Sequence, residues 1–269
     1  NYNYNNYENY LDPDKYIQIW GFYAGWGKRL RWPDDYFQLS LQLSYQRYIL
    51  KNWRYFFVMS NGTANNLSLN ITLNRSSTDN QLYPRTGSEF SASLSITPPW
   101  SKFDKKDYKH LANDRFSATY QEEQQEKYRW VEYHKWKFKA RTFTALNNGN
   151  KCFVLMTRIE FGLLGSYNKY KKSPFETFYM GGDGMSGYSS NYAQETIGLR
   201  GYENGQLTQH GEGYAYERMT LELRYPFLLG NTTIYGLGFV EAGNAWTETS
   251  KFNPFDVKRS AGIGVRIFL

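Results

Sequence analysis

Cysteine is nearly absent from this sequence, and histidine is scarce. The 269 residues include one cysteine, Cys152, and three histidines. A single cysteine cannot form a disulfide within the chain, so no disulfide framework indicates the cellular compartment. A structural zinc site needs four nitrogen or sulfur ligands, and so small a supply argues against one. We therefore expect no metal site and no cofactor.

Long apolar runs are missing as well. No segment approaches the roughly 20 consecutive apolar residues that a membrane-spanning helix needs. Mean hydropathy is −0.71, yet aromatic residues make up 19% of the chain, with 25 Tyr, 18 Phe and 8 Trp. So many rings in so polar a chain indicate strands with one apolar face and one wet face, as in a lipid-embedded β-barrel. A soluble β-sandwich rich in tyrosine is the alternative.

Acidic residues are outnumbered by basic ones, which gives a formal charge of +7 and a pI near 9.2. Such a balance permits binding to nucleic acid or to anionic lipid. The basic residues are spread through predicted strands and loops and form no stripe along a helix. Nucleic acid is therefore not an expected partner.

The main signal in the sequence is alternation of apolar and polar residues with period two, which predicts β-strands. About nine strands are expected, near 15–30, 36–49, 64–75, 87–98, 129–146, 151–166, 212–226, 231–246 and 257–269. In the fifth of these, Lys135, Lys137, Lys139 and Arg141 alternate with apolar residues. A basic, water-filled interior explains that pattern. The Asn- and Tyr-rich residues 1–14 are expected to be a polar loop or a frayed end.

The predicted connections alternate in length. Asn-Gly and Gly-Asn pairs at 147–150 and 228–231 favour tight hairpin turns. Long polar loops are expected near 99–128 and 167–211, with a turn or two of helix possible at 121–127. Short turns at one end and long loops at the other are typical of outer-membrane barrels.

The second long loop carries an Arg-Gly-aromatic tip, Leu199, Arg200, Gly201 and Tyr202, within a segment 197–205 that we expect to be neither strand nor core. Glycine frees the backbone there, and the aromatic ring can anchor the tip by burial. The guanidinium can fork onto a carboxylate, which makes this tip a candidate ionic contact.

Two glutamates are candidate partners of Arg200. Alternation places Glu222 on the polar face of its strand with Arg218 and Arg224, whereas the facing of Glu241 is less certain because its face also carries apolar residues. If both acids face a barrel lumen, they form a receptor for the loop cation. The alternative is that each acid pairs locally with Arg218 or Arg224 and never meets Arg200.

Several motifs resemble those of BamA-like outer-membrane assembly factors, the bacterial surface antigen family. The tip at Arg200 is similar to the family's Arg-Gly-aromatic loop tip, and Phe178, Gly181 and Gly182 match the Phe-x-x-Gly-Gly segment that precedes it. Residues 236–246 resemble the strand with the acid partner, where Glu241 replaces the more frequent Asp. Residues 260–264 match a Ser-Ala-Gly-Ile-Gly strand, and 83–87 resemble a periplasmic turn. The motifs occur in family order.

The resemblance implies an all-β fold, an antiparallel transmembrane β-barrel of which about nine of sixteen strands, the sixth to the fourteenth, are present. Residues 1–269 would then be part of one barrel domain, and the loop at 167–211 would fold back and plug its lumen. In the family such a barrel is not an enzyme. It folds and inserts β-barrel proteins in the bacterial outer membrane, with the lipid bilayer, unfolded clients and accessory lipoproteins as partners.

Two other functions stay open. A two-partner secretion transporter resembles the same superfamily in its Arg-Gly-aromatic loop and exports one polypeptide. An outer-membrane porin or enzyme is the third possibility, but a hydrolase needs a histidine beside a serine on the barrel. His110 and His210 lie in predicted loops, and His134 lies on an apolar face, which indicates a structural role.

Overall fold

The computed structural model describes residues 14–53, 59–149, 151–183, 194–208 and 212–269. Its main element is one nine-stranded antiparallel sheet in the order β1-β2-β3-β4-β5-β6-β9-β10-β11. These strands are β1 (Tyr16–Arg29), β2 (Phe37–Lys51), β3 (Gly62–Ser76), β4 (Gly87–Ile96), β5 (His134–Ala145), β6 (Val154–Gly165), β9 (Ala215–Leu228), β10 (Thr233–Trp246) and β11 (Lys258–Phe268). The predicted all-β antiparallel fold with nine strands is confirmed. Of the predicted polar end at 1–14, all but Asp14 lies outside the described residues.

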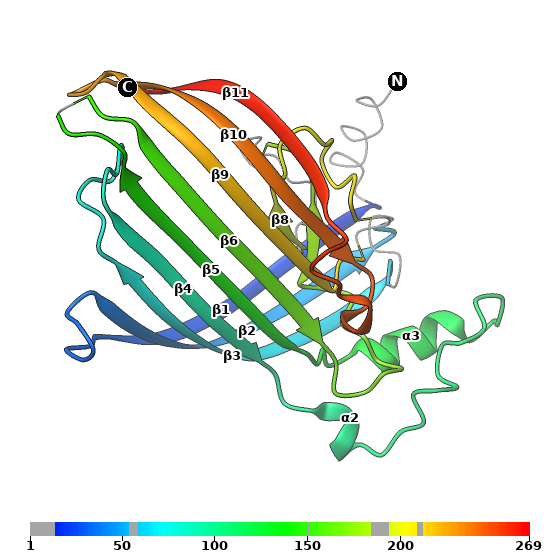
Figure 1. Cartoon of the computed structure of the whole chain (residues 1–269). Helices are drawn as coiled ribbons and strands as arrows, with labels where there is room; N and C mark the ends of the chain where they lie inside the picture. Colours follow the sequence, from blue (N-terminus) through cyan, green and yellow to red (C-terminus); the bar gives the residue numbers. More distant parts are fainter. Residues whose placement is uncertain (1–13, 54–58, 150, 184–193, 209–211) are drawn as a thin grey trace.

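The sheet curves into an open trough with β1 and β11 at its two edges (Figure 1). Alternation along each strand separates an outer face from an inner face, which is the concave one. On β9 the outer Leu221 and Leu223 are 55% and 43% exposed, whereas the inner Thr220, Glu222 and Arg224 are buried. A soluble protein normally buries the apolar set. The reversed arrangement, apolar outside and polar inside, is that of a barrel wall in lipid.

Connections of the two kinds lie at opposite ends of the trough. Turns at 30–36, 77–86, 146–153 and 229–232 alternate with the connections at 52–61, 97–133, 166–214 and 247–257, and the two long connections, 97–133 and 166–214, both belong to the second group. In the described part of the second group there are three short helices, α2 (Trp100–Phe103), α3 (Tyr120–Tyr128) and η2 (Thr249–Lys251). α3 contains the helix expected at 121–127 and projects beyond the sheet (Figure 1). Every helix among the described residues is too short or too polar to traverse a bilayer.

The connection between β6 and β9 contains two strands that sequence patterns did not predict. β7 (Thr177–Met180) and β8 (Gln194–Ile197) pair in parallel with each other on the inner side of the trough (Figure 1). Strands of four residues are too short to show a clear alternation, and these two join no strand of the wall sheet.

This inner loop also has an apolar core, so the expectation that 197–205 is neither strand nor core was wrong. Ile197 ends β8, and Leu199 is fully buried. Both belong to a cluster in which Phe175 stacks on Tyr48 of β2 with ring centroids 4.2 Å apart. Burying these side chains removes apolar area from water and fixes the loop to the inner face of the wall.

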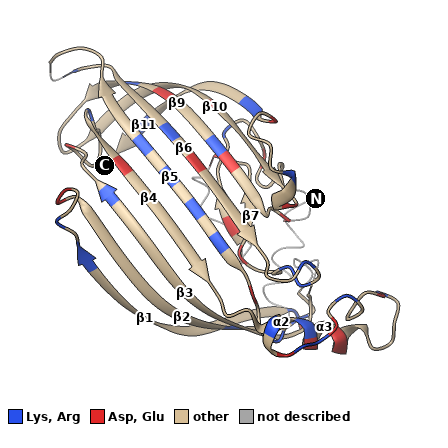
Figure 2. Ribbon diagram, turned by 60° about the horizontal axis from the view of Figure 1, so that its bottom comes forward, with Lys and Arg blue, Asp and Glu red and all other residues tan. Residues whose placement is uncertain are grey.

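The basic residues of β5 lie on the inner face and are paired with acids. The partners are Glu195 for Lys135 and Lys137 (2.8 and 3.0 Å), Glu160 for Lys139 (3.2 Å), and Glu89 for Arg141. Figure 2 shows the resulting mixture of basic and acidic segments on this part of the wall. Charges in a confined space are stabilised by pairing, and the acids come from both the wall and the inner loop.

The turn at 77–86 is anchored inside the trough by Tyr83, which is 2% exposed. Its hydroxyl donates to the carbonyl oxygens of Cys152 and Arg224, at 3.0 and 3.3 Å. Its ring meets Tyr235 edge-on at 5.2 Å between centroids. One side chain thus ties a turn to strands that are distant in the sequence.

Removing this hydroxyl should weaken the turn end of the wall. We expect Tyr83→Phe to lower the free energy of unfolding by about 1 kcal/mol, since it leaves two buried carbonyl groups without their donor. Tyr36→Phe, at a ring that is 53% exposed, is the matched control and should change it by less than about 0.5 kcal/mol. Urea unfolding of the full-length protein in detergent measures both, and equal stability of the two variants would contradict the anchoring role.

Candidate functional site

The base of the inner loop is held by Phe178, one of the predicted loop-base residues. Its side chain is fully buried and packs edge-on against Tyr216 of β9, with ring centroids 4.6 Å apart. The ammonium of Lys135 lies 4.8 Å from the ring centroid, within cation–π range. The backbone N–H of Phe178 donates to the carbonyl oxygen of Gly213 at 2.8 Å. Phe178 therefore joins the loop to β5 and β9 together.

Gly181 and Gly182 form the hinge between the base and the tip. Their φ angles, +136° and +81°, lie in the region that L side chains rarely adopt. A Cβ on Gly181 would come 2.1 Å from the carbonyl oxygen of Glu203. The two N–H groups donate to the carbonyl oxygens of Ile197 and Tyr202, both at 2.9 Å. The two glycines thus let one chain segment run against the other at hydrogen-bond distance.

The tip residues on either side of Arg200 also have defined places. Leu199 is fully buried and forms a β-bridge with Gly182. Gly201 has φ +88°, and a Cβ there would lie 3.0 Å from the Cβ of Ser260 on β11. The Tyr202 hydroxyl donates to the carbonyl oxygen of Arg259 at 3.0 Å. The tip therefore lies against the edge strand β11 as well as the wall strands behind it.

Arg200 binds both predicted acids. Its Nη1 lies 3.0 Å from Glu222 Oε2, and its Nη2 lies 2.7 Å from Glu241 Oε1. The Arg200 backbone N–H donates to the other oxygen of Glu241 at 2.9 Å. The guanidinium carbon lies 3.5 Å from the centroid of the Phe239 ring, a cation–π contact that the sequence did not suggest. One side chain of the loop thus joins β9 to β10 from the inside.

Residues of the wall also bind the two carboxylates. Glu222 is fully buried and also accepts from Arg224 Nε at 2.6 Å. Glu241 is 2% exposed and accepts from Thr220 Oγ1 at 3.1 Å. Removing one partner of a buried ion pair strands the other, at a cost of about 3–5 kcal/mol. The geometry is that of a brace between loop and wall.

The structure also decides the two questions that alternation left open. Glu241 lies on the inner face with Phe239 and the buried Leu237. The purely local alternative is wrong, because Glu222 binds Arg224 and Arg200 together. Arg218 pairs with Glu160 at 2.6 Å and donates to the carbonyl oxygen of Gly198, one residue before the tip.

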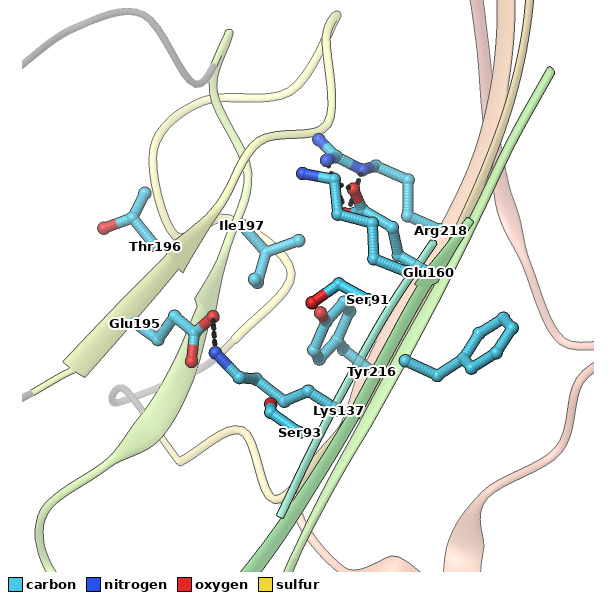
Figure 3. Close-up of a pocket in the computed structure, with 11 residues that line it drawn as sticks. Ser91, Ser93, Lys137, Glu160, Glu195, Thr196, Ile197, Tyr216 and Arg218 are labelled. Atoms are coloured by element: carbon cyan, nitrogen blue, oxygen red, sulfur yellow. Dashed lines mark hydrogen bonds and ion pairs between the residues drawn. The ribbon is translucent and has the colours of Figure 1, made fainter. Parts of the chain in front are cut away.

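A second ionic contact joins the loop to β5, and the sequence did not identify its acidic partners. Glu195 of β8 lies between Lys135 and Lys137, and Lys135 also reaches Glu176 at 3.3 Å. Burial raises the pKa of the Glu195 carboxyl, but the two lysine charges outweigh burial and hold that pKa below its ordinary value. A cavity of about 250 Å³ separates β8 from the wall here, and Figure 3 shows Lys137 reaching across it to Glu195. Only the lysine-rich face of β5 hinted that acids must come from elsewhere.

The two histidines among the described residues, His110 and His134, take no part in this site. His110 pairs with Asp107 at 2.6 Å in the connection between β4 and β5, and His134 accepts from the indole of Trp136, which is 49% exposed. His210 lies outside the described residues. Within the described ranges, no group of three or more His, Cys, Asp or Glu side chains is arranged to hold a metal ion.

Comparison with known proteins identifies the family. The model of the Omp85 superfamily domain matches residues 2–269. The chain belongs to the Omp85 superfamily. Among solved structures, this Omp85 chain resembles BamA from Haemophilus ducreyi lacking POTRA domains 1–3, with a TM-score of 0.59 and 17% sequence identity. The match covers 93% of this chain and 48% of that one, so the chain spans about half the length of the solved BamA. At this identity the likeness is one of fold. A search of curated proteins found no match.

The hinge of the Omp85 loop offers a matched pair of substitutions. Gly181→Ala should destabilise the loop, since it combines a strained φ with a clash against the backbone at Glu203. Gly149→Ala shares the positive φ but has nothing within 4 Å, so it isolates the strain alone. We expect Gly181→Ala to increase the rate at which added protease cuts the connection 166–214 by more than about tenfold. A local destabilisation of roughly 1.4 kcal/mol is already enough for a tenfold increase. Equal cleavage rates for Gly181→Ala and Gly149→Ala would contradict the role given to Gly181 in the loop.

Proposed function

We propose that this Omp85 chain is part of the barrel of a BamA-like assembly factor that folds and inserts β-barrel proteins into the bacterial outer membrane. The observation that carries the proposal is the placement of Arg200 between Glu222 and Glu241. It supplies, in this chain, the loop-to-wall contact that the family motifs imply. The role is mechanical rather than enzymatic.

The loop acts as an internal brace of the wall. It contacts three neighbouring strands, β9 and β10 through Arg200 and β11 through Tyr202. Sliding of these strands along one another would separate Glu222 from Glu241 and break at least one of the two ion pairs. The brace therefore holds register and curvature on one side of the barrel. An edge elsewhere can then open, so that a client strand adds to it by backbone hydrogen bonding.

The outer face supplies the membrane contact of the proposed barrel. Leu221, Val240 and Ile263 are 55%, 54% and 91% exposed on adjoining strands β9, β10 and β11. A continuous apolar outer face is stable against lipid tails and unfavourable in water. We propose the lipid bilayer, unfolded outer-membrane clients and accessory lipoproteins as partners, and the outer membrane as the location. The described parts of the loop at 167–211 would occupy the lumen.

Charge reversal of the brace tests the function in cells. In the full-length protein, Arg200→Glu places three carboxylates together, so we expect a several-fold fall in folded outer-membrane barrel proteins. Arg115→Glu makes the same charge change at an exposed position in the connection between β4 and β5 and is the control. Quantitative immunoblots of outer membranes, corrected for the amount of each variant, measure the effect.

Two outcomes would overturn the proposal. Unchanged barrel-protein levels in the Arg200→Glu strain would remove the role given to the brace. Normal barrel-protein levels together with failed export of one secreted polypeptide would assign the chain to a secretion transporter instead.

A further inference from the structure

The outer face of the wall carries an arginine without a partner. Arg47 of β2 belongs to the same outward-facing set as Leu43 and Tyr45, whereas its neighbour Tyr48 is buried in the inner core. Among the described residues, the Arg47 guanidinium forms no ion pair and no hydrogen bond. Its Nε is buried, while its two Nη atoms are accessible from outside. A charge on a face turned toward lipid is stabilised only by water or by an anion.

Aromatic and polar side chains surround Arg47 on this face. The strand register sets Arg47 opposite Trp20 of β1 and Asn65 of β3, and Asn65 forms a β-bridge with Trp130. The Tyr45 hydroxyl donates to Asn65 Oδ1 at 2.8 Å, and its ring meets Trp20 edge-on at 5.9 Å between centroids. Tryptophan and tyrosine gather where lipid headgroups meet the acyl chains. Arg47 thus lies within an aromatic girdle.

The length of the apolar belt places Arg47 at the same level. Arg47 is ten residues from Phe37 along β2, and Phe37 pairs with Arg75 near the turns at the other end. Ten residues rise about 34 Å, and a strand tilt of 35–45° reduces this to about 24–28 Å across a membrane. Residues 38–46 and 66–74 carry no charged side chain, so they are tan in Figure 2. Since the apolar band of such a barrel is about 25 Å tall, the two arginines mark its borders.

The arginine at the opposite border is neutralised by the chain itself. Arg75 pairs with Asp34 at 2.8 Å and donates to two serine hydroxyls, at 3.0 and 2.8 Å. Among the described strands of the wall, the acid in the outward-facing set is Glu217 of β9, and β3, β4, β5 and β6 lie between it and β2. No acid of the described wall therefore neutralises Arg47, and its counter-charge must come from the surroundings.

We propose that Arg47 binds the phosphate of a membrane lipid, in the leaflet at the end of the wall that carries the long connections. The two Nη donors match two phosphate oxygens, and lipid phosphates lie at the level of the girdle. The acyl chains of that lipid would run over the outward-facing Leu43 and Leu41. This inference rests on the membrane placement in the proposed function, and it names the lipid chemistry at one point of that contact.

Native mass spectrometry of the full-length protein in detergent, with one lipid added at a time, tests the site. We expect phosphatidylglycerol to bind more tightly than an uncharged glycosyl diacylglycerol with the same acyl chains. Arg47→Gln should weaken phosphatidylglycerol binding about fivefold, since one basic residue near a membrane surface contributes about that factor. It should leave binding of the uncharged lipid within twofold. Arg115→Gln removes the same group from an exposed loop position and should leave both affinities within twofold.

A second variant guards against a folding defect. Arg47→Lys keeps the charge and loses the fork, so we expect it to bind phosphatidylglycerol less tightly than the original protein but more tightly than Arg47→Gln. The gel mobility shift on heating shows whether each barrel is folded.

Three results would overturn the lipid site. One is equal affinity for the two lipids, and another is binding of phosphatidylglycerol by folded Arg47→Gln or Arg47→Lys as tightly as by Arg115→Gln. The third is displacement of the lipid by inorganic phosphate at an ionic strength held constant with chloride, which would make a free anion the occupant. Barrel-protein levels in the Arg200→Glu strain report on assembly separately, so failure of the lipid site and failure of the proposed function can be told apart.

Discussion

The contact of Arg200 with Glu222 and Glu241 is the interaction on which the rest of the inner loop depends. Both carboxylates are almost fully buried, and a buried charge is tolerated only when paired and hydrogen-bonded. Delivering a guanidinium to them requires a loop that turns back on itself. The hinge at Gly181 and Gly182 provides that turn, and the burial of Phe178 and Leu199 holds it. Apolar packing thus holds the loop against the wall, while the ion pairs of Arg200 fix the position of the loop along the wall.

Charge also fixes which way round the loop docks. Its cation, Arg200, faces the acids of β9 and β10, whereas its anions, Glu195 and Glu176, face the lysines of β5. A loop rotated within the lumen would bring like charges together at both places, which costs several kcal/mol in a confined region. The wall in turn is stable because its apolar side faces outward and its charges face one another.

Period-two alternation predicted the nine wall strands and the inward facing of Glu222, because both are local properties of the chain. Glu241 was ambiguous, since its face carries Leu237 and Phe239. Partners from elsewhere in the chain explain why Phe239 shares the inner face with Glu241. Arg200 stacks on the Phe239 ring, and Gly262 leaves room for that ring, since a Cβ on Gly262 would lie only 2.7 Å from it. β7, β8 and the partners of the β5 lysines were not predictable either. They depend on how a distant loop docks, which no local periodicity encodes.

A double-mutant cycle between Arg200 and Glu241 measures the central contact most directly. It compares the unfolding free energies of the full-length protein, Arg200→Ala, Glu241→Gln and the double variant. The direct ion pair predicts a coupling of about 1–3 kcal/mol, since contacting residues in one network are not additive. Additive effects, with a coupling below about 0.5 kcal/mol, would show that Arg200 does not hold the loop to the wall and would contradict the account.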